Sequence, residues 1–209
     1  MRVRSSRFLL PALLWALPAV VSAQAAPPLS AADLGALRLR NIGPASMSGR
    51  VVDMDVVESN PSTWYVAGAT GGLWRTEDNG VTWASTFDAP VHSIGDVAVF
   101  QPNPQILWVG TCERASRQSV GWGDGVYKST DGGKTWQNMG LATSMHIGRI
   151  QLHPRDPNIA YVAAQGSVWG AGGERGLYRT TDGGRSWTRT LAVDDETGAT
   201  DVAMDWNDP

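Results

Sequence analysis

The stretch that decides the fold is Ser129-Thr130-Asp131-Gly132-Gly133-Lys134-Thr135-Trp136, which the chain repeats with small changes at residues 76–83 and 180–187. Each copy begins at the hydroxyl residue that ends a five-residue segment, in which a glycine is followed by an aliphatic, an aromatic, a basic and that hydroxyl residue. These segments begin at Gly72, Gly125 and Gly176, at intervals of 53 and 51 residues. A period of this length indicates an architecture built from repeated units.

The chemistry of the repeated stretch favours a tight turn. An aspartate at its head accepts hydrogen bonds from the backbone N–H groups that follow, and the glycine two residues later tolerates positive φ. A hydroxyl residue two positions before the aspartate adds a bond, and the tryptophan supplies a large apolar surface. Because every unit carries the pattern, we interpret it as structural, and not as a catalytic or calcium site. The positions concerned are Thr76, Asp78, Gly80, Trp83, Ser129, Asp131, Gly133, Trp136, Thr180, Asp182, Gly184 and Trp187.

Short strands precede each copy. Apolar residues alternate with others, which predicts strands with one face more buried than the other. Each such strand ends at an Asn-Pro or Asp-Pro corner, where proline stops the hydrogen-bond ladder. The alternating pairs are Met54 and Val56, Val97 and Val99, Ile150 and Leu152, and Val202 and Met204; the prolines are Pro61, Pro104, Pro157 and Pro209.

The repeat therefore predicts an all-β fold. Four short antiparallel strands in a unit of about 50 residues, with no helix, are typical of a β-propeller blade. We expect a partial β-propeller of three four-stranded antiparallel blades at about residues 50–88, 94–138 and 147–191, plus the first strand of a fourth from about residue 200. Closed propellers have about 4 to 8 blades. We therefore interpret the chain as an N-terminal fragment whose partners include the remaining blades of a longer protein.

The chain resembles the BNR or Asp-box repeat proteins, whose motif is Ser-x-Asp-x-Gly-x-Thr-Trp. The order Arg40-Asn41-Ile42-Gly43-Pro44, Gly49-Arg50, Gly123-Asp124-Gly125 and Glu174-Arg175-Gly176 is similar to exported bacterial proteins with a sortilin N-terminal-type propeller. Those proteins are often labelled glycosyl hydrolases. The resemblance implies a propeller and leaves its activity open.

The first residues predict export. Arg2, Arg4 and Arg7 precede an apolar run at residues 8–21 and small residues at Ser22 and Ala23, which is typical of a signal peptide, residues 1–23. Cleavage after Ala25 is the alternative. Residues 24–36 then form a flexible linker and residues 37–209 the incomplete Asp-box propeller, in the periplasm or the medium. The apolar run is too short to span a membrane, so no span is expected after cleavage.

Composition excludes several classes of protein. The chain has 24 glycines, 10 tryptophans, 42% hydrophobic and 18% charged residues, which excludes wholesale disorder and a coiled coil. Its formal net charge of -3 gives no reason to expect nucleic acid as a partner. The sole cysteine, Cys112, excludes an intrachain disulfide. We expect no cofactor and no metal.

Loop lengths predict which end binds a ligand. The segment between the Asn-Pro or Asp-Pro corner and the aspartate of the repeated turn is longer in the second and third units than in the first. The extra residues, 111–124 and 165–175, fall between the second and third strands. Such loops share an end with the links between blades. Their charged and aromatic residues suit a polar ligand, peptide, protein or carbohydrate, although the same loops also fit a plain cover of solvated ion pairs. Ligand-binding candidates are His92, Arg114, Arg117, Trp122, His146, Trp169 and Arg175; Glu174 and Arg175 also fit a simple ion pair.

Catalysis stays an open alternative. A glycosidase needs two carboxylates on either side of the scissile bond, and the candidates here are Glu113, Asp124 and Glu174. The xyloglucan-cleaving relatives of the Asp-box family carry an aspartate shortly before the Gly-Gly of an early third strand, and Ala69-Thr70-Gly71-Gly72 has none. We therefore expect a binding scaffold. A glycoside hydrolase is the first alternative, and an assembly factor for an envelope or membrane complex is the second.

One further strand is expected near the start. Residues 39–44 precede Asp53 by the offset at which residues 82–87 precede Asp96, so they correspond to a fourth strand. This strand is expected to complete the last blade of the whole protein and to have no proper partner in the fragment.

Overall fold

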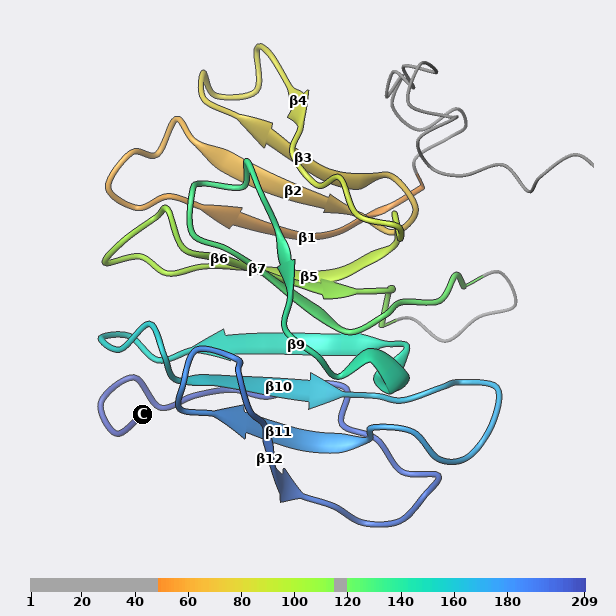
Figure 1. Cartoon of the computed structure of the whole chain (residues 1–209). Coiled ribbons are helices and arrows are strands. Elements are labelled where there is room, and N and C mark those ends of the chain that lie inside the picture. Colours follow the sequence, from red (N-terminus) through yellow and green to blue (C-terminus); the bar gives the residue numbers. More distant parts are fainter. Residues whose placement is uncertain (1–48, 115–119) are drawn as a thin grey trace, which may run out of the picture. The chain divides into compact units, whose positions relative to one another are not determined.

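The computed structural model describes residues 49–114 and 120–209. The predicted signal peptide, the linker, the strand at residues 39–44 and Arg117 lie outside these residues. Within them, twelve strands form three four-stranded antiparallel sheets, and the short 3-10 turn Ala142–Ser144 is the sole helical element (Figure 1). The prediction of an all-β fold with three four-stranded blades is confirmed.

Each sheet is a meander of consecutive strands. The first blade consists of β1 (Val51–Val56), β2 (Trp64–Gly68), β3 (Gly72–Thr76) and β4 (Ala84–Ser85). The second consists of β5 (Ile94–Val99), β6 (Leu107–Thr111), β7 (Val126–Ser129) and β8 (Gln137–Asn138). The third consists of β9 (Ile147–Leu152), β10 (Ala160–Ala164), β11 (Gly176–Thr180) and β12 (Thr188–Leu191).

The first strands of the blades lie against one another, β1 beside β5 and β5 beside β9. Glycines make this approach possible: a Cβ added to Gly95 would lie 2.2 Å from the carbonyl oxygens of Cys112 and Ile147, and one added to Gly148 would lie 2.2 Å from the carbonyl oxygen of Thr200. The pairing with the second strand shifts register at the same place in every blade, which is a β-bulge. Because a bulge redirects the side chains beside it, it aims the next residue toward the adjacent blade.

The turns separate into two ends of the sheets. At one, which we call the box end, the corner after each first strand bonds the repeated Asp-Gly turn: Asn79 N donates to Ser62 O at 3.1 Å and Gly132 N to Gln105 O at 3.0 Å. At the other, the loop end, the loop between strands two and three bonds the link between blades. Cys112 N donates to Ser93 O at 2.7 Å and Gln165 N to His146 O at 2.9 Å. Figure 1 shows these two sets of loops at opposite ends of the strands.

The apolar core lies between blades. One buried cluster joins the first and second blades around Tyr65, Leu73 and Phe87, and another joins the second and third around Trp108 and Ile150. Burying these faces supplies most of the drive for stacking the sheets. Each blade therefore depends on its neighbour for its core.

The alternate apolar residues of a first strand were predicted to be buried, and this holds where a preceding blade covers them. Val97 and Ile150, which face the preceding blade, are 3% and 2% exposed, whereas Met54 is 54% exposed. Met54 is exposed because the side chains on either side of it, Asp53 and Asp55, point to β5, which leaves Met54 on the other face of β1.

The expected first strand of a fourth blade forms no regular strand in residues 192–209. Ala199 N donates to Ala164 O at 3.0 Å, and the carbonyl of Thr200 lies against Gly148, so the segment follows the course of a first strand beside β9. It carries no ladder of its own because no described segment pairs with it on the other side.

Candidate functional site

The structure places the candidate carboxylates at the loop end but uses all three internally. Glu113 is fully buried, and its carboxylate pairs with the guanidinium of Arg50. Asp124 accepts a hydrogen bond from the Tyr127 hydroxyl at 2.6 Å. Glu174 accepts bonds from the backbone N–H and the hydroxyl of Thr143 at 3.0 and 2.9 Å.

Arg175 is a loop clamp and not the partner of Glu174. It is 4% exposed, and its five N–H groups donate to five carbonyl oxygens. The acceptors belong to Gln165, Ser167, Gly170, Gly172 and Glu196. A guanidinium has five donors, so none is left for a ligand. The predicted ion pair of Glu174 with Arg175 is wrong: each finds local partners because the loop folds around the guanidinium.

The two histidines differ. His146 is buried, its Nδ1 lies 3.1 Å from Glu113 O, and burial lowers its pKa. His92 is exposed, and its carbonyl accepts a bond from Gly72 N at 2.8 Å. Arg114 is partly exposed. His92 and Arg114 are therefore open to a ligand at this end, whereas His146 is not.

Large apolar side chains are exposed at the loop end. Trp122 and Trp169 are each 67% exposed, and Met145 is 38% exposed. The backbone around them is fixed: Gly123 N donates to Met145 O at 2.8 Å and Trp169 N to Ser167 Oγ at 3.1 Å. Met145, Leu141 and Cys112 also hold positive φ of 63°, 56° and 61°. Such left-handed conformations of non-glycine residues cost about 1–3 kcal/mol each and concentrate at functional sites.

The repeated turns at the box end share one hydrogen-bond pattern. In the second blade, Asp131 Oδ1 accepts bonds from Ser129 Oγ, Lys134 N and Thr135 N at 2.8 to 3.0 Å, and its Oδ2 accepts the Thr135 hydroxyl at 2.6 Å. The Ser129 hydroxyl in turn accepts Gly133 N at 2.9 Å. Asp78 and Asp182 repeat this arrangement with their own neighbours. All bonds to these carboxylates come from residues within four positions.

These bonds favour the ionised carboxylate. The Thr135 hydroxyl and backbone N–H lower the pKa of Asp131 to about 2, and the equivalent bonds of Thr82 lower that of Asp78 to about 2. The Ser186 bonds lower the pKa of Asp182 in the same way. The three carboxylates are therefore charged and fully engaged in their turns at neutral pH.

The turn tryptophans join neighbouring blades. Trp136 Nε1 donates to Thr86 O at 2.6 Å, and its ring packs edge-on against Phe87 of the first blade. Trp187 Nε1 donates to Met139 O of the second blade at 2.7 Å and packs against Trp108. Trp83 is 40% exposed and donates to Gly80 O of its own turn at 3.0 Å.

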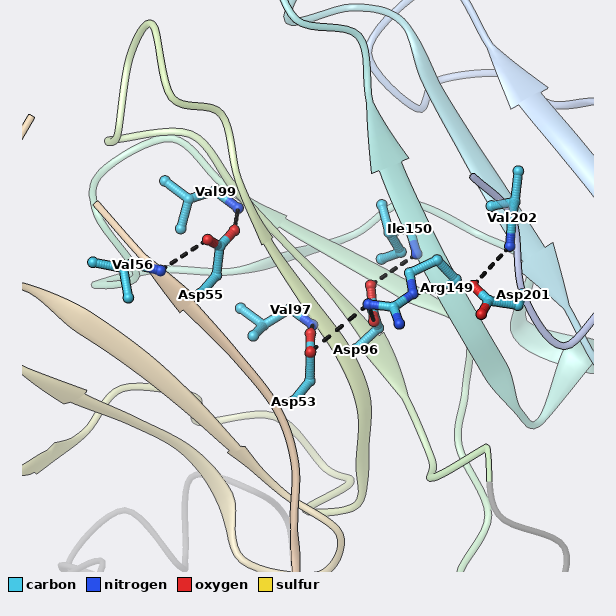
Figure 2. Close-up of polar contacts among 10 residues, drawn as sticks. All are labelled: Asp53, Asp55, Val56, Asp96, Val97, Val99, Arg149, Ile150, Asp201 and Val202. Atoms are coloured by element: carbon cyan, nitrogen blue, oxygen red, sulfur yellow. Dashed lines mark hydrogen bonds and ion pairs between the residues drawn. The ribbon is translucent and has the colours of Figure 1, made fainter. Parts of the chain in front are cut away.

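A second set of charged residues lies on the three first strands and on the segment that follows the course of a fourth. We call it the inner-strand cluster: Asp53, Asp96, Arg149 and Asp201. Arg149 lies between Asp96 and Asp201 (Figure 2), with its Nη1 3.2 Å from Asp96 Oδ1 and its Nε 3.2 Å from Asp201 Oδ1. Asp53 Oδ1 lies 3.8 Å from the same Nη1. The other oxygens reach the next blade: Asp53 Oδ2 accepts Val97 N at 3.0 Å, and Asp96 Oδ2 accepts Ile150 N at 2.8 Å.

Burial dominates the electrostatics of the inner strands. Asp96 is 1% exposed, and loss of solvent together with the neighbouring Asp53 carboxylate raises its pKa to about 8, although Ile150 N and Arg149 oppose the shift. Burial likewise raises the pKa of Asp55, which accepts Val99 N at 2.7 Å, to about 6. At neutral pH Asp96 therefore holds a proton beside the Asp53 carboxylate. The cluster joins blades; its buried acid is closed to a substrate.

Sequence reasoning missed this cluster, although a signal was present. Asp53, Asp96, Arg149 and Asp201 each stand directly before the first alternating apolar residue of their unit. Alignment of the four units on that residue places all four charges in one column. A charged residue at the same place in every first strand indicates a contact between blades.

Two further classes of site are absent from the described residues. No three His, Cys, Asp or Glu side chains in residues 49–114 and 120–209 are placed to share a metal ion. No helix in the same part of the chain is long and apolar enough to cross a membrane.

Comparison with solved structures identifies the architecture. An ancestral GH74 enzyme matches 72% of this chain and 19% of its own length, at 23% identity and a TM-score of 0.57. The fold is a partial β-propeller. YCF48 bound to D1 peptide matches 70% of this chain and 42% of its own length, at 20% identity and a TM-score of 0.49. An auxiliary nutrient binding protein from Bacteroides thetaiotaomicron matches 72% and 32%, at 14% identity and a TM-score of 0.49.

The propeller therefore spans about a fifth of the GH74 enzyme and less than half of YCF48. No family model and no curated protein matches the sequence. A fold alone does not decide activity. The narrower resemblance to Asp-box and sortilin-type proteins stays a prediction.

Proposed function

We propose that the partial propeller is an exported scaffold that binds a peptide, protein or glycan ligand at its loop end. The observation that carries this proposal is the exposure of Trp122, Trp169 and Met145 at that end. Exposed aromatic side chains on a rigid support are typical of binding surfaces, because they offer a large contact area at small conformational cost.

The support for these side chains is built in advance. Arg175 holds the third-blade loop and the link at Glu196 together through carbonyl groups. The strained residues Leu141 and Met145 lie in the link between the second and third blades. A surface that is ordered before binding loses less entropy when a ligand arrives. This preformed order favours a binding role over a flexible cover of the propeller end.

A glycoside hydrolase is the alternative, and the GH74 fold match is the reason to test it. The engagement of Glu113, Asp124 and Glu174 with Arg50, Tyr127 and Thr143 speaks against it, because an acid catalyst and a base or nucleophile must face the scissile bond. An assembly factor for an envelope complex is compatible with the same scaffold.

Ligand screening tests the proposal. The purified chain is presented to a glycan array and to a peptide library, and binding is compared with that of the Trp122→Ala/Trp169→Ala double variant. We expect the double variant to lose affinity by about tenfold or more, because stacking on both rings is removed. Unchanged binding by the double variant contradicts a loop-end site. Turnover of a glycan panel that Glu113→Gln abolishes supports the hydrolase instead.

A further inference from the structure

The loop end carries a cavity in the third blade that none of the above uses. It has a volume of about 440 Å³ and opens between the loop after β10 and the link that follows β12. This volume lies within the range of small-molecule sites, about 300–1,000 Å³. Its walls consist of Gln165, Ser167, Val168, Gly170, Ala171, Arg175, Glu196, Gly198 and Thr200.

We propose that this cavity binds an uncharged sugar unit of a glycan, with the ring of Trp169 stacking on that unit or on the next. This inference rests on the proposed function and names its ligand. Trp169 stands between two wall residues, Val168 and Gly170, and its backbone N–H is bonded to the wall residue Ser167. The backbone of Trp169 is therefore fixed to the cavity wall, and its indole is an exposed aromatic ring carried by that same wall segment.

The charges of the cavity favour a neutral ligand. Arg175 is the cation of the wall, but all five of its donors are bonded to carbonyl oxygens, so it offers no fork to a carboxylate or phosphate. Glu196, an exposed wall residue, repels anions. An acidic ligand would meet repulsion without a compensating hydrogen bond.

The polar groups of the wall suit hydroxyl groups. The amide oxygen of Gln165 is buried without a hydrogen-bond partner among the described residues, and such an orphaned acceptor costs about 1–3 kcal/mol. A ligand hydroxyl that bonds the Gln165 amide relieves that cost. The hydroxyl of Thr200 and the carboxylate of Glu196 add a donor and acceptors. Mixed donors and acceptors beside an aromatic ring match the polar edges and apolar face of a sugar.

A peptide fits the same walls less well. A peptide that binds by adding a strand needs free backbone groups along an edge. Here the carbonyls of Gln165, Ser167 and Gly170 already accept bonds from Arg175, and Gly172 N donates to Asp195 O at 2.7 Å. The backbone of the wall is therefore largely occupied, and recognition falls to side chains.

The test uses a matched pair of tryptophans. Trp122 and Trp169 are equally exposed at the loop end, but of the two only Trp169 stands in sequence between two residues of the cavity wall. Neutral hexose oligosaccharides and uronic-acid oligosaccharides are titrated against the wild-type chain, Trp169→Ala, Trp122→Ala and Thr200→Val by isothermal titration calorimetry. We expect Trp169→Ala to weaken binding of the neutral sugars by about tenfold, and Trp122→Ala by less than about twofold.

The outcomes separate this inference from the proposed function. Tighter binding of the acidic oligosaccharides, or greater loss with Trp122→Ala than with Trp169→Ala, overturns the cavity as the sugar site. Binding of peptides without any binding of sugars also overturns it, while the loop-end scaffold stands. If neither sugars nor peptides bind, both the sugar site in the cavity and the binding surface at the loop end are contradicted. Equal melting temperatures of the variants confirm that losses do not come from unfolding.

Discussion

The aspartates of the turns and those of the inner strands are the same residue type in opposite environments. Asp78 and Asp131 lie in turns that stabilise their charge, and their pKa values fall to about 2. Asp96 lies between blades, and burial beside Asp53 raises its pKa to about 8. The difference shows that repetition of an acid has two structural uses here, one local and one between blades.

The sequence separation between each aspartate and its hydrogen-bond donors explains the two structural roles. Asp131 is bonded by residues within four positions, so it holds one turn in shape. Asp53 and Asp96 accept bonds from residues 44 and 54 positions away, in the next blade. Loss of a turn acid therefore disturbs one turn, whereas loss of an inner acid opens a joint between two sheets.

Removal of an inner acid is expected to have the largest effect. In Asp96→Ala, Ile150 N loses its acceptor and Arg149 loses one of its two nearest carboxyl groups. We expect the free energy of unfolding to fall by about 3 kcal/mol, because a buried N–H group is left without its acceptor and the removed carboxyl leaves a gap between the blades. Urea denaturation at pH 7 measures it. A loss no greater than that of Asp131→Ala removes the distinction between the two sets.

Replacement of the same acid by its amide tests the proton. Because the folded-state pKa of Asp96 is about 8 and its ordinary value 3.8, its contribution is complete below about pH 4 and is lost as pH rises toward 8. We expect Asp96→Asn to match the wild type near pH 4 and to lose less stability than the wild type between pH 4 and 8.

Thermal unfolding of both proteins at several pH values provides the measurement. Asp55→Asn is the companion variant. Because the pKa of Asp55 is about 6, we expect the stability that its proton contributes to be lost as pH rises toward 6. Parallel curves for the wild type and Asp96→Asn would show that Asp96 is ionised in the folded chain.

A pair of tryptophans gives an intermediate effect. Trp136→Phe removes the bond from Nε1 to Thr86 O across the blade joint, whereas Trp83→Phe removes one to Gly80 O of its own turn. We expect the first change to lower the free energy of unfolding by about 1 kcal/mol and the second by less. Chemical denaturation of both variants measures the difference; equal losses argue against a joining role for Trp136.

The smallest effect is expected for a turn acid. Asp131→Asn keeps an acceptor for Thr135 N and replaces the oxygen that accepts the Thr135 hydroxyl. Because the pKa of Asp131 is lowered from 3.8 to about 2, its contribution is present above about pH 4 and is lost as pH falls toward 2. The melting temperature should be slightly lower than that of the wild type at pH 7 and equal to it at pH 2.

The strands and turns were predictable because their signals are local. The alternation of Val97 and Val99 and the spacing from Asp131 to Trp136 each lie within one segment. The contacts of Arg149 were not, because Asp53, Asp96 and Asp201 come from other units and meet it only when the sheets stack.

The loop end shows the same limit. Proximity in sequence paired Glu174 with Arg175, but the loop turns Glu174 toward Thr143 and surrounds Arg175 with carbonyl groups. Glu113 gave no sign of its burial against Arg50, which lies in another blade's first segment. The charged loop residues therefore lie together at one end of the sheets, as the loop lengths predict, but the sequence does not reveal which of them are engaged within the loops.

Carboxyl NMR titration of the ¹³C-labelled chain tests the contrast between the two sets of aspartates most directly. Assignment through Asp96→Asn and Asp131→Asn identifies the two key signals. We expect the Asp96 carboxyl to titrate near pH 8 and that of Asp131 near pH 2. Titration of both near their ordinary value of 3.8 would contradict the assignment of one acid to the blade joint and the other to its turn.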